Sequence, residues 1–128
     1  MILADTSVVI DILRSRDARL LDIAIDQQAA ICGVTRAEVL HGPRDANHRA
    51  KLLRTLDLFL TVPMPDALWD QVGDVLATLR AAGLTVPLAD VVIAVVAVSH
   101  DLELWAHDKH FGAIQRAIPV LKLFQESP

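Results

Sequence analysis

The chain opens with the stretch Met1-Ile2-Leu3-Ala4-Asp5-Thr6-Ser7, in which a short apolar run ends at an acid and two hydroxyl residues. A short run that is apolar at every position is typical of a strand buried on both faces of a parallel sheet. In open parallel sheets, ligands bind outside the carboxyl ends of the strands. We therefore expect Asp5 to point into a site. Ser7 either hydrogen-bonds a ligand or metal-bound water there, or caps the following helix.

Beyond this stretch, short apolar runs alternate with longer amphipathic ones, which predicts an α/β domain with a mostly parallel sheet. The expected strands are Met1–Ala4, Ala30–Gly33, Phe59–Val62, Leu102–Ala106 and Val120–Leu123. The expected helices are Ser7–Leu13, Asp17–Gln28, one from Thr35 to the Gly42-Pro43 stop, Asn47–Leu58, one capped by Asp66 that runs to Ala82, and Asp90–His100. Periodicity alone leaves the last of these open to a buried strand, and its length favours a helix. No repeat or linker is visible, so residues 1–128 are expected to form a single domain.

Composition excludes several classes of protein. With 128 residues, of which 53% are hydrophobic, the chain can bury a core and is not of the disordered class. The single cysteine, Cys32, cannot form an intramolecular disulfide, and its apolar context predicts a small buried side chain. The longest apolar run, Val91 to Val98, is far below the roughly 20 residues of a membrane-spanning helix. With no signal-peptide pattern either, we expect a cytoplasmic protein without a membrane role.

The net charge of −4 argues at face value against a nucleic-acid partner. Two observations oppose that argument. Several acids could belong to a cation site, and the basic residues are clustered: Arg14, Arg16 and Arg19, then Arg36, Arg44, Arg49, Lys51 and Arg54. Most of the cations are arginine, which suits bidentate phosphate contacts. These clusters are either a nucleic-acid surface or solvated helix faces.

Three more acids lie, like Asp5, beside apolar segments. Glu38 falls in the helix after the second expected strand, Asp90 heads the run Val91–Val98, and Asp108 follows the strand Leu102–Ala106. An acid beside such a segment is costly to bury unless it is paired, hydrogen-bonded or bound to a metal. Carboxylate oxygens suit Mg²⁺ or Mn²⁺. The four acids therefore predict one converging site for metal-assisted phosphodiester cleavage, in which a metal-bound water attacks phosphorus.

Each acid also has a purely structural interpretation. Asp5 and Asp90 could be helix N-caps, Glu38 could be the capping-box partner of Thr35, and Asp108 could be a turn residue. Taken singly, these signals are weak. Their joint occurrence in these contexts favours a site.

The histidines offer a competing metal site. His100, His107 and His110 lie close in sequence to Asp101 and Asp108, and imidazole favours Zn²⁺ or Ni²⁺ over Mg²⁺. No cysteine can join them. Surface histidines, or substrate contact by His107 or His110, are the alternatives.

Four segments carry a family resemblance that covers the whole chain. They are Asp5-Thr6-Ser7-Val8-Val9-Ile10-Asp11, Glu38-Val39-Leu40-His41-Gly42, Pro87-Leu88-Ala89-Asp90 with Ile93, Ala94 and Ala97, and Ala106-His107-Asp108-Lys109-His110-Phe111. Through them the chain resembles the PIN-domain nucleases, and within these the VapC-type toxins of bacterial toxin–antitoxin pairs. The resemblance implies that Asp5, Glu38, Asp90 and Asp108 bind Mg²⁺ or Mn²⁺ and that Ser7 supports them. It also implies a three-layer α/β/α fold, a homodimer, an RNA substrate and a cognate VapB-like antitoxin.

The chain departs from the family pattern at two positions around Asp108. Ala106 stands where many relatives have Thr or Ser, and His110 stands where many have another acid. Both changes reduce the hydrogen bonding and the negative charge around Asp108. The leading hypothesis is a metal-dependent endoribonuclease acting as a toxin. The alternatives are a degenerate PIN domain that only binds RNA or a partner, a housekeeping RNA-processing nuclease, and a phosphoryl-transfer enzyme with Asp5 as nucleophile, which position 7 disfavours because it lacks the usual second acid.

The two tryptophans are expected in the core or at a dimer interface rather than stacked on bases. A composition rich in Ala, Val and Leu predicts an apolar surface that favours dimerisation. Trp69 and the region of Leu76 and Leu79 are the expected contact.

Overall fold

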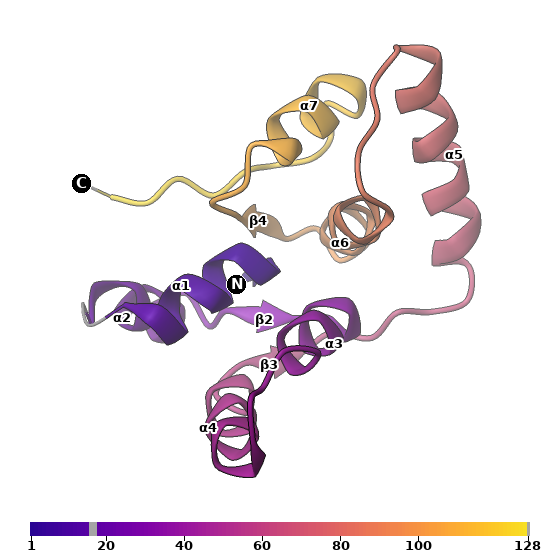
Figure 1. Cartoon of the computed structure of the whole chain (residues 1–128). Helices are drawn as coiled ribbons and strands as arrows, with labels where there is room; N and C mark the ends of the chain where they lie inside the picture. Colours follow the sequence, from indigo (N-terminus) through magenta and orange to yellow (C-terminus); the bar gives the residue numbers. More distant parts are fainter. Residues whose placement is uncertain (16–17, 128) are drawn as a thin grey trace.

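A four-stranded parallel sheet forms the centre of the chain, as a computed structural model that describes residues 1–15 and 18–127 shows (Figure 1). The strands are β1 (Ile2–Ala4), β2 (Ala30–Ile31), β3 (Leu60–Thr61) and β4 (Glu103–Trp105), in the order β3-β2-β1-β4. Leu3 of β1 pairs with Ala30 on one side and with Leu104 on the other. The first strand thus lies inside the sheet, and the predicted parallel topology is confirmed.

Helices cover both faces of this sheet. They are α1 (Thr6–Arg14), α2 (Arg19–Asp26), α3 (Gly33–Leu40), α4 (Ala46–Leu56), α5 (Leu68–Ala81), α6 (Leu88–Ser99) and α7 (His110–Ala117). Leu3, Ala30 and Leu104 pack against residues of α5, α6 and α7. Ile2 and Ile31, on the other face, pack against α1, α2 and α4. Because alternate strand residues point to opposite faces, the sheet has two cores, and the expected three-layer α/β/α fold is confirmed.

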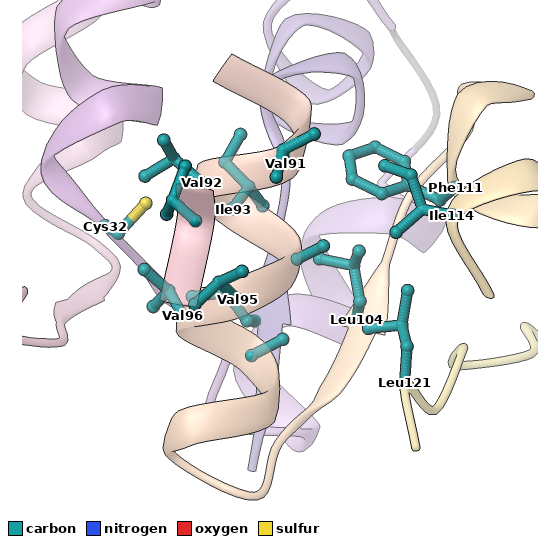
Figure 2. Close-up of a cluster of buried hydrophobic side chains, with 14 of the residues drawn as sticks. Cys32, Val91, Val92, Ile93, Val95, Val96, Leu104, Phe111, Ile114 and Leu121 are labelled. Carbon is teal, nitrogen blue, oxygen red and sulfur yellow. The ribbon is translucent and has the colours of Figure 1, made fainter. Parts of the chain in front are cut away.

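Helix α6 runs through the middle of one core. Every residue from Val91 to Ala97 is buried, so the helix is apolar on all sides. Figure 2 shows its valines among Leu104, Phe111, Ile114, Leu121 and Cys32. The helical interpretation of this run was therefore correct. Cys32 is the expected buried side chain, and burial raises the pKa of its thiol.

The structure corrects several expected elements. Val120–Leu123 is not a strand. Leu104 and Leu123 form an isolated bridge, in which the Leu104 N–H donates to the Lys122 carbonyl oxygen and the Phe124 N–H donates to the Leu104 carbonyl oxygen. The helix α7 was not predicted. The helix expected from Asp66 begins at Leu68. The carbonyl oxygens of Pro65 and Asp66 accept hydrogen bonds from the backbone N–H groups of Leu68 and Trp69 in a turn before it, and no side chain caps it.

The second helix begins at Arg19 within the described residues. Its expected start at Asp17, and the cation Arg16, lie outside them. No helix in the described part of the chain is both long and apolar enough to cross a membrane.

Candidate active site

Asp5 lies at the carboxyl end of β1 and is 2% exposed. Its Oδ1 accepts hydrogen bonds from the Val8 backbone N–H at 3.2 Å and from Ser7 Oγ at 2.7 Å. Asp5 is thus the N-cap of α1 as well as a side chain at the sheet edge. Its pKa is raised to about 6, chiefly by burial; the charge of Asp90 also acts to raise it, whereas the bonds from Ser7 and Val8 act to lower it.

Ser7 connects Asp5 with a segment from the far end of the chain. Its hydroxyl donates to Asp5 and accepts a hydrogen bond of 3.0 Å from the backbone N–H of His107. The cap of α1 is supplied by Asp5. Ser7 is therefore placed to orient the Asp5 carboxylate and to fix the loop between β4 and α7.

Asp90 and Asp108 meet at His110. Asp90 lies in the first turn of α6, which begins at Leu88, so the N-cap alternative for Asp90 is wrong. Its Oδ2 is 2.7 Å from Nδ1 of His110, and the same nitrogen is 3.1 Å from Asp108 Oδ1. Asp108 Oδ1 also accepts the His110 backbone N–H at 2.8 Å. Burial raises the pKa of Asp90; the bond from His110 lowers it, and the charges of Asp108 and Glu38 raise it.

Glu38 is exposed on α3, and its Oε1 accepts a hydrogen bond of 2.5 Å from Thr6 Oγ1. The helix begins at Gly33, and Thr35 is buried inside it, so the capping-box alternative is wrong. The partner of Glu38 is instead the residue after Asp5. This bond ties α3 to the end of β1.

The charges of the four acids interact with one another through Asp90. The charges of Glu38 and Asp108 act on Asp90, and the charge of Asp90 acts on Asp5. Within residues 1–15 and 18–127, the group with metal-binding spacing is Asp90, Asp108 and His110, whose ligand atoms all lie within 4.8 Å of one another. Two carboxylates and an imidazole fit a divalent cation of the first transition row or Mg²⁺.

The alternative site of three histidines is not formed. His100 Nε2 lies 2.8 Å from the carbonyl oxygen of Pro63, and His107 contacts Asp11 and Glu126. Only His110 reaches the acids. Sequence reasoning treated it as a departure from the family pattern, and its spacing two residues after Asp108 was the one signal that it could join them.

His107 joins the C-terminal segment to the site. Its Nδ1 is 2.5 Å from Asp11 Oδ2, and its Nε2 is 2.5 Å from Glu126 Oε1. Glu126 also accepts from Trp105 Nε1 at 2.8 Å and from Arg19 at 3.1 Å. Burial opposes the charged imidazole, but its two carboxylate partners raise the pKa of His107; burial likewise opposes the charged form of Glu126, whose donors lower its pKa. Sequence reasoning did not find this network, because no local pattern links position 126 to position 107.

A groove extends from Glu38 along α1, α3 and α4. It has a volume of about 300 Å³ and is lined by Ile10, Leu13, Arg14, Glu38, Val39, His41, Gly42, His48, Lys51 and Leu52. A neighbouring hollow shares Ile10, Glu38 and His41 with it. Its floor is apolar, and its rim carries Arg14 and Lys51. Part of the expected basic clusters thus lines a groove, whereas Arg36 is paired with Asp57 at 3.2 Å.

A family model described as PIN domain matches residues 2–117. The chain belongs to the PIN-domain family. Its fold is similar to that in the structure of VapBC2 from Rickettsia felis bound to a promoter DNA fragment, with a TM-score of 0.85, 18% identity and coverage of 99% of this chain and 100% of that one. VapBC-1 from nontypeable Haemophilus influenzae gives a TM-score of 0.76 at 21% identity, covering 97% of each chain. VapBC-5 from Mycobacterium tuberculosis gives 0.72 at 24% identity, covering 98% of each chain. No curated protein matches the sequence significantly.

In this PIN domain, each of the two departures from the family pattern has a structural consequence. Ala106 lacks a hydroxyl and packs against the core, so the loop before Asp108 is held instead by the bond from His107 to Ser7. His110 places a ring nitrogen between Asp90 and Asp108, where many relatives have another carboxylate.

Proposed function

We propose that this PIN domain is a divalent-metal-dependent endoribonuclease and the toxin of a VapBC-like pair. The observation that carries the proposal is the spacing of Asp90, Asp108 and His110, whose ligand atoms lie within 4.8 Å of one another. The buried carboxyl of Asp5, with a pKa raised to about 6, is the kind of perturbed group that functional sites concentrate. The PIN-domain family supports nuclease chemistry, and the likeness to VapBC structures supports the toxin assignment.

In this proposal, Asp5, Glu38, Asp90 and Asp108 hold Mg²⁺ or Mn²⁺. When bound, such a cation makes a coordinated water more acidic and offsets the charge that develops on the phosphate. Ser7 keeps the Asp5 carboxylate oriented, and Thr6 does the same for Glu38. No side chain acts as a nucleophile, which is why Ser at position 7 is compatible with the reaction.

The rim of the groove beside Glu38 is the proposed path of the RNA backbone. Arg14 and Lys51 supply charges that can contact phosphates, and Glu38 lies where the groove reaches the acids. A strand held on this rim would lead toward Asp90. The proposed reaction is cleavage of RNA in the cytoplasm.

The proposed partners are a cognate VapB-like antitoxin and a second copy of the chain. Two of the similar solved structures are described as a toxin–antitoxin complex from Klebsiella pneumoniae and a member of the VapBC family of toxin–antitoxin systems, which supports the first. For the homodimer, Trp69 is 47% exposed and available, whereas Leu79 is 1% exposed in the chain's own core and cannot form the contact. Leu79 is therefore withdrawn from the expected interface.

The test is cleavage of RNA by the purified protein, with Mg²⁺, with Mn²⁺ and with a chelator. Cleavage that requires either ion supports the proposal. Tight RNA binding without cleavage at any metal concentration would instead indicate the degenerate PIN domain. Cleavage without growth arrest on expression would indicate a housekeeping nuclease.

A further inference from the structure

His110 is held at the entrance of α7 by its own main chain. Its backbone N–H donates to Asp108 Oδ1 at 2.8 Å, and this bond holds the His110 backbone beside the Asp108 carboxylate. The side chain then crosses to α6, where Nδ1 lies 2.7 Å from Asp90 Oδ2. One nitrogen is therefore shared between an acid of α6 and an acid of the loop before α7.

The spacing of these atoms fits adjacent ligands of one ion. Ligands at neighbouring corners of an octahedron, each about 2.1 Å from the ion, lie about 3 Å apart. Nδ1 of His110 is 2.7 Å from Asp90 Oδ2 and 3.1 Å from Asp108 Oδ1. The ring is also 46% exposed, so that its Nε2–H can face water while Nδ1 offers its lone pair. Small shifts of the side chains would let one cation replace the proton between these atoms.

We propose that His110 Nδ1 is a ligand of the divalent cation and that it makes the site selective for Mn²⁺ over Mg²⁺. This rests on the proposed function, because the same carboxylates form the centre. Mg²⁺ binds oxygen donors and gains little from imidazole, whereas affinity for nitrogen-containing sites increases from Mn²⁺ along the first transition row. A carboxylate at position 110 would give an all-oxygen set, and the histidine replaces it with a softer donor.

The experiment is pulsed electron paramagnetic resonance on the Mn²⁺-loaded full chain, together with calorimetric titration of Mn²⁺ and Mg²⁺. The wild type should show magnetic coupling between Mn²⁺ and a ¹⁴N nucleus, and this should change to the ¹⁵N pattern when the histidines are ¹⁵N-labelled. In His110→Asp, Mn²⁺ should still bind but without nitrogen coupling. The ratio of the Mg²⁺ and Mn²⁺ dissociation constants should fall by about tenfold. His100→Gln, whose ring contacts Pro63, is the matched control and should keep the wild-type signal.

The outcomes separate this proposal from the one on which it rests. Mn²⁺ binding by the wild type without nitrogen coupling overturns the role of His110 and leaves the carboxylate site intact. Nitrogen coupling that persists in His110→Asp overturns it as well, since another histidine is then the ligand. No binding of either ion by the folded wild type refutes the metal site itself. The isotope experiment needs no substitution, so the proposal stays testable if His110→Asp does not fold.

Discussion

His107 and Ser7 lie 100 positions apart in the sequence, and the backbone N–H of one donates to Oγ of the other at 3.0 Å. The Ser7 hydroxyl in turn donates a hydrogen bond of 2.7 Å to Asp5 Oδ1. The loop that carries Asp108 is thereby tied to the strand end that carries Asp5. The relative position of two proposed ligands thus depends on one hydroxyl group.

Replacing that hydroxyl should lower activity without abolishing it. Ser7→Ala removes one donor and one acceptor, so Asp5 and the loop of Asp108 lose their common support. Groups that orient ligands typically contribute 10- to 100-fold to metal affinity or activity, and we expect about a tenfold loss in kcat/KM for RNA. Ser99→Ala, whose hydroxyl contacts a carbonyl within α6, is the control and should cleave like the wild type. An unchanged Mn²⁺ affinity and rate in Ser7→Ala would contradict the positioning role.

Removing the charge of a proposed ligand should have a much larger effect. Asp5→Asn and Asp90→Asn keep the shape of the side chain, but each removes a negative charge from the metal site. We expect cleavage to fall by roughly two orders of magnitude or more and growth arrest on expression to disappear. Asp74→Asn, on the exposed side of α5, should change neither. The assignment fails if a folded Asp5→Asn, Asp90→Asn double variant still cleaves RNA and arrests growth.

The metal-free protein should gain stability when Asp5 loses its charge. Because the folded pKa of Asp5 is raised from 3.8 to about 6, the folded state holds a proton that the unfolded state has released. The resulting stabilisation is complete below pH 3.8 and is lost as the pH rises through about 6. At neutral pH the ionised carboxylate therefore costs up to roughly 3 kcal/mol. Asp5→Asn should raise the melting temperature in chelator. The gain in free energy of unfolding should grow from pH 4 to pH 7 by an amount on the order of this 3 kcal/mol. A gain that is independent of pH would show that ionisation of Asp5 is not its cause.

The C-terminal segment should be held most firmly at intermediate pH. Because the pKa of Glu126 is lowered, the stability that this group contributes is lost as the pH falls through its folded-state pKa. Because the pKa of His107 is raised, the stability that this group contributes is lost as the pH rises through its folded-state pKa. Glu126→Gln should speed amide hydrogen exchange in residues 121–127 below the pKa of His107, at a cost of about 1 kcal/mol. Above that pKa the difference from the wild type should shrink to what the bonds of Glu126 with Trp105 and Arg19 contribute. Asp70→Asn, at an exposed position of α5, is the control, and faster exchange in it as well would point to a general loss of charge.

Salt dependence should reveal whether the groove binds RNA. Each phosphate contact to a single strand contributes roughly 0.7 to the slope of log K against log salt concentration. Arg14→Ala and Lys51→Ala, at the rim of the groove, should each reduce that slope by about this amount. Arg80→Ala, an exposed cation on α5, should leave it unchanged. Equal slopes in all these proteins would exclude the groove as the RNA path.

Local pattern was sufficient to predict four strands of the parallel sheet and Asp5 at its edge, although the fifth strand expected at Val120–Leu123 does not form. The apolar run Ile2–Ala4 is too short for a helix, so a buried strand was the remaining choice, and Asp5 directly after it falls at the carboxyl end. The run from Val91 to Ala97 has a composition typical of either element, but its length agrees with the helix that forms. These features depend on neighbours in the chain, which a sequence displays directly.

Contacts between distant segments were not predictable in the same way. That His110 meets Asp90 depends on where α7 starts and how it packs on α6, and α7 itself was missed. The bonds of Glu126 to His107 and Trp105 depend on the path of the C-terminal segment. That segment forms only one bridge, to Leu104, where a strand was expected. The sequence by itself therefore determined which residues could carry the chemistry, because apolar runs that must be buried locate the strands along the chain and the polar residues that follow them. Only the tertiary structure decided which of them share hydrogen bonds, because a difference of a few ångströms in packing decides whether two polar side chains meet.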